Sequence, residues 1–193
     1  MRLDEFVNNK VLSELKKPNT RGLAGNLLKN NGYEKIGKGS FATVWGKPGE
    51  DFLIKIFDNS DKAYPAFVNL AMKNSNDHFP KFKGKVTKVN EKYSGIRVER
   101  LEPMSESQFI SLGLEPVYKY LNYIRDVQRG VEHNWQQDQV STMMEQMEKL
   151  EKTQPGMKQA LTTIAQNLNY VFDVQPQNFM LRGKTVVILD PVV

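Results

Sequence analysis

"VFDVQPQNFMLRGKTVVILDPVV" (residues 171–193) is the stretch on which the predicted fold depends most. Asn178 follows Asp173 by five residues, and Asp190 follows Asn178 by twelve. Apolar runs on both sides of Gly183 predict a β-hairpin, because a glycine-containing turn between two strand-like segments is typical of one. Asp190 is therefore predicted to end the second strand, and Asp173 and Asn178 to lie in the loop before the first.

The composition is that of a folded protein. Of the 193 residues, 39% are hydrophobic and 25% are charged, which suits one sizeable core or two small lobes that share a cleft. The absence of cysteine from the sequence excludes disulfides, thiolate catalysis and zinc–thiolate sites. Only two histidines, His78 and His133, are present, which argues against a histidine-based metal site. Any metal is therefore expected to be held by oxygen ligands.

Two classes of partner are not expected. No apolar run approaches the roughly 20 residues of a membrane helix, and residues 1–10 lack the apolar core of a signal peptide. We therefore expect a cytoplasmic protein without a membrane partner. The net charge of +5 is scattered, with residues 81–88 as the densest patch. Because the sequence has no zinc-finger, basic-zipper or RNA-recognition signature, nucleic-acid binding is not expected either.

The N-terminal half is predicted to combine helices with a small sheet. Apolar spacing predicts helices over residues 3–16 and 22–32, the second ending at Gly32 as a left-handed cap. Alternating runs separated by turn residues predict about five strands in an antiparallel meander, with one helix between the third and the fourth. The strands are expected at residues 33–37, 41–46, 51–57, 81–89 and 95–101, and the helix at residues 61–74.

The C-terminal half is predicted to be helical up to the hairpin. Helical spacing of apolar residues extends over residues 115–131, 139–153 and 156–171. We therefore predict an α+β, two-lobed arrangement whose lobes join near Ser105. The expected divisions are a helical extension at residues 1–32, a sheet lobe at residues 33–104 and a minimal helical lobe at residues 105–193.

A glycine-containing turn and a strand lysine suggest an anion site in the sheet lobe. Gly37 and Gly39 follow a strand, and alternate glycines let backbone amides approach a phosphate, although a plain hairpin turn explains the same pattern. Lys55 lies between Ile54 and Ile56 in a predicted strand. Burial of its charge there is costly unless it meets an anion, the alternative being a snorkelling or edge-strand lysine.

Together, the glycine turn, the strand lysine, the D-x-x-x-x-N loop and the strand-end Asp resemble the protein-kinase-like superfamily over residues 33–193. The sequence is most similar to the small early-gene serine/threonine protein kinases of podovirus-type bacteriophages, a likeness to which "AYPAF" (residues 63–67) adds. The resemblance implies a two-lobed protein-kinase-like fold that uses ATP and Mg²⁺. It assigns Gly37, Lys38, Gly39, Ser40, Phe41 and Val44 to nucleotide contacts, Lys55 to the α- and β-phosphates, Glu99 and Leu101 to the adenine hinge, Asp173 with Lys55 to catalysis, and Asn178 and Asp190 to Mg²⁺.

The sequence departs from the protein-kinase pattern at several positions. The predicted helix after Lys55 contains no glutamate to pair with it, and Tyr64 at the start of that helix is expected to offer at best a hydroxyl. Gln175 stands where protein kinases keep a phosphate-contacting lysine. The other departures are Ala42 for the third glycine, Val171 and Phe172 for His-Arg, and Pro191 and Val192 for Phe-Gly.

Three functions remain in view. The leading hypothesis is an ATP- and Mg²⁺-dependent serine/threonine protein kinase, phage-encoded, that phosphorylates itself and host proteins such as transcription or defence proteins. The alternatives are a catalytically weak kinase-fold protein that binds and inhibits a host protein, and a small-molecule kinase of the aminoglycoside-phosphotransferase type.

The position of the motif near the end of the sequence leads to one further expectation. The sequence stops three residues after Asp190, which leaves open a natural minimal kinase or a domain of something longer. Without later helices, a protein substrate would dock on residues 139–152, whose methionines, Met143, Met144 and Met147, would then be partly exposed. Methionine at helical spacing is more typical of a core, so the two readings compete.

Overall fold

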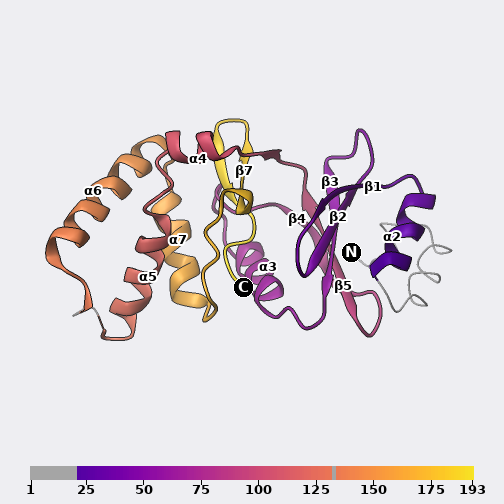
Figure 1. The fold of residues 1–193 in the computed structure, drawn as a ribbon, viewed down its shortest axis with the longest axis horizontal. Helices are drawn as coiled ribbons and strands as arrows, with labels where there is room; N and C mark the ends of the chain where they lie inside the picture. The colour runs from indigo at the N-terminus through magenta and orange to yellow at the C-terminus, as the bar shows by residue number, and fades with distance from the viewer. Residues whose placement is uncertain (1–20, 132–133) are drawn as a thin grey trace. The chain divides into compact units, whose positions relative to one another are not determined.

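The computed structural model describes residues 21–131 and 134–193 (Figure 1). The chain divides into two compact units: unit 1 is Met1–Pro65 with Lys81–Arg100, and unit 2 is Ala66–Pro80 with Leu101–Val193. The helix expected over residues 3–16 lies outside the described residues. None of the helices in the two described ranges has both the length and the apolar character needed to span a membrane.

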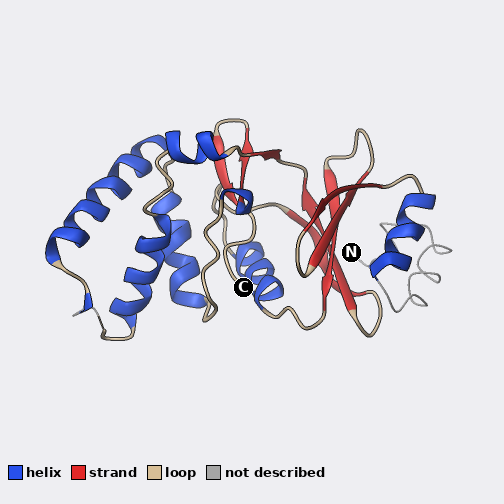
Figure 2. Cartoon of the chain, in the orientation of Figure 1, coloured by secondary structure: helices blue, strands red, loops and turns tan. Residues whose placement is uncertain are grey.

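Unit 1 is built on a five-stranded antiparallel sheet (Figure 2). Its strands are β1 (Glu34–Lys38), β2 (Ala42–Gly46), β3 (Phe52–Asp58), β4 (Phe82–Lys88) and β5 (Tyr93–Glu99). The five expected strands are confirmed, but the meander is wrong at one point, because the order is β1-β2-β3-β5-β4 and β3 pairs with β5. The connection from β3 to β4 contains a helix, α3 (Ala63–Lys73). A connection of that kind, unlike a tight turn, does not force consecutive strands to pair.

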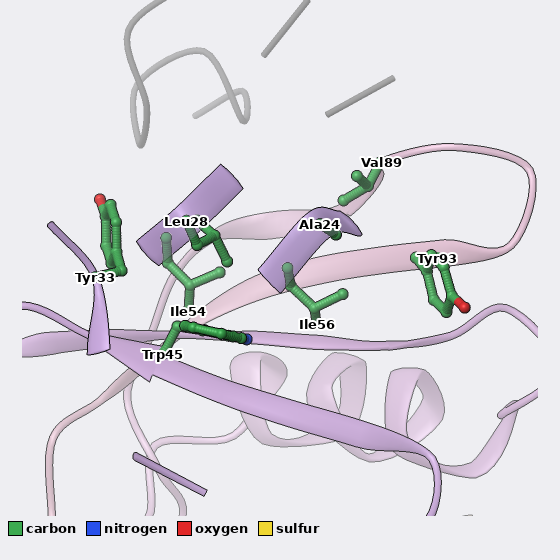
Figure 3. Close-up of a cluster of buried hydrophobic side chains, with 8 residues drawn as sticks. All are labelled: Ala24, Leu28, Tyr33, Trp45, Ile54, Ile56, Val89 and Tyr93. Carbon is green, nitrogen blue, oxygen red and sulfur yellow. The ribbon is translucent and has the colours of Figure 1, made fainter. Parts of the chain in front are cut away.

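Helix α2 (Arg21–Asn30) covers one face of this sheet. Gly32 follows it with φ of 80°, the left-handed cap that the sequence predicts. Apolar side chains of the helix and of the strands form one buried cluster (Figure 3), made of Ala24, Leu28, Tyr33, Trp45, Ile54, Ile56, Val89 and Tyr93. Since burial of a large apolar side chain contributes roughly 1.5–3 kcal/mol, this cluster is the main attachment of α2 to the sheet.

Unit 2 is mainly helical, as expected. Three of its helices match the predicted segments, and a short additional helix precedes them. Beyond the part of α3 that belongs to unit 2, the helices are α4 (Glu106–Ser111), α5 (Val117–Gln128), α6 (Gln137–Thr153) and α7 (Met157–Asn167). Ser105 begins α4 through a reciprocal capping box: its side chain accepts from the N–H of Gln108, and the Gln108 side chain accepts from the N–H of Ser105 at 2.9 Å. The S-x-x-Q pattern is a sequence signal for a helix start that the prediction of unit 2 overlooked.

The methionines of α6 belong largely to the core. Met143 and Met147 are only 3% and 0% exposed, and only Met144 is half-buried. Met143, Met147 and Leu150 lie one and two turns apart on the buried stripe of the helix, where apolar side chains face the interior. The expectation that this face is exposed for docking is therefore wrong for Met143 and Met147.

A second sheet, of three strands in the order β6-β7-β8, carries the C-terminal motif. The strands are β6 (Glu102–Pro103), β7 (Phe179–Arg182) and β8 (Thr185–Ile188). Gly183 turns the chain between β7 and β8 with φ of 60°, which confirms the predicted hairpin. The side chains of β8 from Val186 to Ile188 are fully buried.

Two buried side chains, and no further strand, bond the outer edge of β8. Gln154, 5% exposed, donates from Nε2 to the carbonyl of Lys184 at 3.0 Å and accepts from the N–H of Val186 at 2.9 Å. His78, 1% exposed, places Nδ1 2.7 Å from the carbonyl of Val186. The backbone carbonyl of His78 accepts from the N–H of Ile188 at 2.8 Å. These bonds satisfy backbone groups that would otherwise be buried without partners, so β8 is fixed on both of its edges.

Candidate functional site

Asp173 lies in unit 2, beside the segment that follows β8. Phe172 and Val192 form an antiparallel β-bridge, and the N–H of Asp173 donates to the carbonyl of Pro191 at 2.8 Å. The two segments of the C-terminal motif are thus paired backbone to backbone. The chain that carries Asp173 is thereby fastened to the residue directly after Asp190.

Arg125 of α5 supports the same segment. Its guanidinium carbon lies 4.4 Å from the centroid of the Phe172 ring, and its Nη1 donates to the carbonyl of Tyr170 at 3.0 Å. An arginine from a helix thus contacts Phe172, one of the two positions that replace His-Arg of the kinase pattern. Sequence reasoning missed Arg125, because no spacing rule links a helix residue to a loop more than forty positions later.

Asn178 lies between the two acidic positions. It ends a short 3₁₀ turn, Pro176–Asn178, and its Nδ2 donates to the backbone carbonyl of Asp173 at 2.9 Å. The carbonyl of Asn178 accepts from the N–H of Leu189 at 2.8 Å. Because the amide nitrogen is the end that faces a carbonyl acceptor, the Oδ1 end of the Asn178 side chain is the one left to bind a ligand.

The structure of unit 2 therefore brings together the three C-terminal residues that the sequence singles out. Asp190 directly follows Leu189, whose N–H is bonded to Asn178, and precedes Pro191, whose carbonyl is bonded to Asp173. Asp173 and Asp190 are both half-buried. A loop carboxylate, an amide oxygen and a strand-end carboxylate thus occupy neighbouring backbone positions.

The oxygen donors of Asn178 and Asp190 suit Mg²⁺. The Asp190 carboxylate and Asn178 Oδ1 are hard oxygen ligands, and Mg²⁺ usually takes one or two carboxylates together with waters and substrate phosphates. Residues 21–131 and 134–193 contain no group of three or more His, Asp or Glu side chains arranged to hold a metal ion. Two protein oxygen ligands would leave most positions of an octahedral Mg²⁺ to waters or to a ligand.

In unit 1, the glycines of the β1–β2 turn are not required by the fold. A Cβ added at Gly37 would come no closer than 3.9 Å to Val44, and one at Gly39 no closer than 4.0 Å to the Ala42 carbonyl. Neither glycine has a positive φ. A Cβ would thus be tolerated at both positions in ordinary van der Waals contact. Since neither backbone conformation nor internal packing explains the glycines, their lack of a side chain suits the close approach of a ligand to the backbone.

The strand register divides the predicted nucleotide contacts of unit 1 between two faces. Val44 pairs with Lys55 across β2 and β3, so these two side chains share one face of the sheet. Lys38 pairs with Thr43, and Thr43 lies on the face of Trp45, the one covered by α2. The side chain of Lys38 is therefore on the opposite face from Lys55, and only its backbone is placed for the role that the resemblance gives it.

Lys55 is buried against an aromatic ring. It is 6% exposed, and its Nζ lies 3.3 Å from the centroid of the Tyr64 ring. The Tyr64 ring is in turn held edge to face by Phe57 at a centroid distance of 5.2 Å. The expectation that Tyr64 offers at best a hydroxyl is wrong, because it offers the ring face. A desolvated cation–π contact of this kind is worth about 2 kcal/mol.

The predicted hinge contains the boundary between the two units, which falls after Arg100. Glu99 ends β5, and its N–H donates to the carbonyl of Lys81 at 2.9 Å while its carboxylate accepts from the N–H of Lys81 at 2.6 Å. Leu101 is half-buried. Adenine contacts by Glu99 and Leu101 stay a prediction, and the N–H of Glu99 is already engaged within unit 1.

Comparison with known proteins identifies no family for the chain. No family model matches the sequence. No curated protein matches it either. Among solved structures that resemble it is the crystal structure of Rad53 1-466 in complex with AMP-PNP, at 15% sequence identity and a TM-score of 0.40. The match covers 89% of this chain and 42% of that chain, so the present chain spans less than half of its length. The α+β class expected from the sequence, with a small antiparallel sheet and a helical unit, is confirmed by the structure itself.

Proposed function

We propose that the chain is an ATP- and Mg²⁺-dependent serine/threonine protein kinase, encoded by a bacteriophage, that phosphorylates host proteins and itself. The observation that carries the proposal is the set of hydrogen bonds in unit 2 that joins the segments of Asp173, Asn178 and Asp190. The choice of protein hydroxyls as acceptors, and of a host as their source, rests on the resemblance of the sequence motif.

In the proposed reaction, the hydroxyl oxygen of a substrate Ser or Thr forms a bond to the γ-phosphorus of ATP. The bond from that phosphorus to the β,γ-bridging oxygen breaks and ADP leaves. The hydroxyl proton passes to the carboxylate of Asp173. Because phosphoryl transfer depends mainly on positioning, the backbone bonds that hold Asp173 matter as much as its charge.

The other residues have supporting roles in this proposal. Asn178 and Asp190 hold Mg²⁺, which supplies neutralisation of charge on the phosphate oxygens. Lys55 contacts the α- and β-phosphates, and stacking on Tyr64 restricts the positions its ammonium group can take. The lack of a side chain at Gly37 and Gly39 admits the phosphates to the backbone there.

The test uses the full chain with γ-labelled ATP, Mg²⁺ and bacterial lysate. Asp173→Ala is expected to lower transfer about 10²- to 10⁴-fold while leaving Mg·ATP binding nearly unchanged, since it removes the proton acceptor only. Asp190→Asn is expected to weaken Mg²⁺-dependent nucleotide binding. The matched control is Asp138→Asn, which removes an exposed carboxylate at the start of α6 and should change neither quantity.

Binding is followed by the rise in melting temperature, which for a ligand at about 100 times its Kd corresponds to about 2.7 kcal/mol. Absence of any shift at millimolar Mg·ATP would remove the nucleotide premise. Binding without transfer in the unaltered chain would instead support a nucleotide-binding protein that acts on a partner without turnover. Equal loss of binding in Asp173→Ala and Asp190→Asn would show that the two roles are misassigned.

A further inference from the structure

Unit 1 contains a cavity on the sheet face that α2 covers. Its volume is about 640 Å³, and it lies between Gly25 and Asn26 of the helix and the β1–β2 hairpin. The register pairs Lys35 with Trp45 and Lys38 with Thr43, and all four residues line the cavity. Gly39 and Ser40 of the β1–β2 turn complete the lining, so the cavity adjoins the proposed nucleotide contacts at this turn. Val44 and Lys55 share the other face of the sheet.

The described residues that line the cavity present donors and positive charge. Lys35 and Lys38 supply two ammonium groups, and no described acidic residue is part of the lining. Both lysine side chains are exposed enough to move toward a ligand. A lining of this kind favours an anion over a cation or a neutral ligand.

Thr43 adds a buried donor to this lining. Thr43 is only 9% exposed. Its hydroxyl oxygen accepts a hydrogen bond from Nε1 of Trp45 at 3.0 Å. Within the described part of the chain this is the only hydrogen bond of that hydroxyl, so its own hydrogen is left to donate. Buried polar groups normally find a partner, and an acceptor in the cavity would supply one.

Trp45, which lines the cavity, packs closely against α2. The backbone of Gly25 approaches the indole of Trp45 so closely that a Cβ at residue 25 would lie 2.7 Å from Cζ2 of the ring. Trp45 is itself part of the buried cluster beneath α2 (Figure 3). The hydroxyl of Thr43 is therefore hydrogen-bonded to a side chain that is packed into the buried cluster.

We propose that this cavity binds a small molecule that carries a phosphate group. Two lysines match the charge of a phosphate dianion, and lysine serves as a point-charge ligand for phosphate. The volume lies within the roughly 300–1,000 Å³ typical of small-molecule sites, so the ligand is larger than inorganic phosphate. The proposal does not depend on the proposed kinase activity.

The experiment follows the two tryptophan indole N–H signals of the full chain by NMR during a titration with pyrophosphate in the absence of divalent metal. The signal of Trp45, whose N–H is bonded to Thr43, is expected to move and saturate. The signal of Trp135, which lies in unit 2 and donates to Asp126 at 2.9 Å, serves as the internal control and should stay fixed. Trp135→Phe assigns the two signals.

Three variants identify the site. Lys35→Gln combined with Lys38→Gln is expected to weaken binding at least about tenfold, because it removes both charge-assisted contacts. Lys29→Gln combined with Lys47→Gln removes the same charge from the same unit outside the cavity and should retain the Kd. Thr43→Val, which keeps the side-chain shape, should weaken binding about threefold to tenfold through the lost hydrogen bond.

Lys55→Met separates the two faces of unit 1. If the proposal is right, Lys55→Met leaves unchanged the pyrophosphate Kd that is measured from the Trp45 signal. The proposal is overturned if the Trp45 signal does not move at millimolar pyrophosphate, or if the cavity and control double variants weaken binding equally. It is also overturned if Lys55→Met abolishes the change while the cavity variants do not, since pyrophosphate would then bind on the face of Lys55.

Discussion

Replacement of Gln154 by methionine tests how far one side chain fixes the strand that precedes Asp190. Methionine keeps the length and most of the volume of glutamine but can neither donate to Lys184 nor accept well from Val186. The N–H of Val186 belongs to a fully buried residue, so leaving it without a partner costs about 1–3 kcal/mol. Lys184 is exposed, so its carbonyl can turn to water and only a net bond of about 0.5–1.5 kcal/mol is lost. The expected loss of unfolding free energy is the sum, about 1.5–4.5 kcal/mol.

The measurement is equilibrium urea unfolding followed by far-ultraviolet circular dichroism, which reports mainly on the helices of unit 2. The matched control is Gln159→Met on α7, an exposed position where a surface substitution should stay within about 0.5 kcal/mol. Amide hydrogen exchange at Val186 should accelerate in Gln154→Met and not in the control. If the two variants have equal stability, or if Val186 stays protected in both, the edge of β8 is not held by Gln154.

Two further predictions concern the buried contacts of each unit. Tyr64→Leu is expected to lower the melting temperature of the free protein and to reduce the rise in melting temperature with Mg·ATP, because Lys55 loses the ring that holds its ammonium group. Tyr64→Phe keeps the ring and should retain most of the melting temperature and most of its rise with Mg·ATP. If Tyr64→Phe behaves like Tyr64→Leu, the ring contact is not what matters. Met147→Lys is expected to destabilise unit 2 by more than about 3 kcal/mol, because it buries an unpaired charge. Met144→Lys, at a half-buried position, should cost much less. If both variants match the unaltered chain in urea unfolding, the expectation of an exposed docking face on α6 would be correct after all.

The elements of the fold were predictable from the sequence because they depend on local patterns. Alternation located all the strands of unit 1, and glycines placed the C-terminal end of α2 and the turn of the last hairpin. Strand order was not predictable in the same way. It depends on how the chain returns after α3, and hydrophobic alternation within β4 and β5 is the same whichever of them pairs with β3.

The candidate site was predictable where it depends on spacing within one short segment. Asp173, Asn178 and Asp190 lie in such a segment, and the structure joins their backbones. The contact of Lys55 with the Tyr64 ring was not predictable. No sequence pattern distinguishes a helix tyrosine that offers its ring face from one that is simply buried. The bonds of His78 and Gln154 to β8 join positions that are 108 and 32 residues apart, and no periodicity of the sequence links them.

The arrangement around β8 also bears on solubility. A small sheet with open edges is a template on which a second molecule can add a strand, and such edges are a common start of aggregation. Here one edge is occupied by the side chains of Gln154 and His78. The other is β6, which is only two residues long and consists of a glutamate and a proline, Glu102–Pro103. A short, charged strand that ends in a residue without an N–H offers little to an incoming chain. The same bonds that fix the strand before Asp190 thus leave the sheet closed to pairing with another copy.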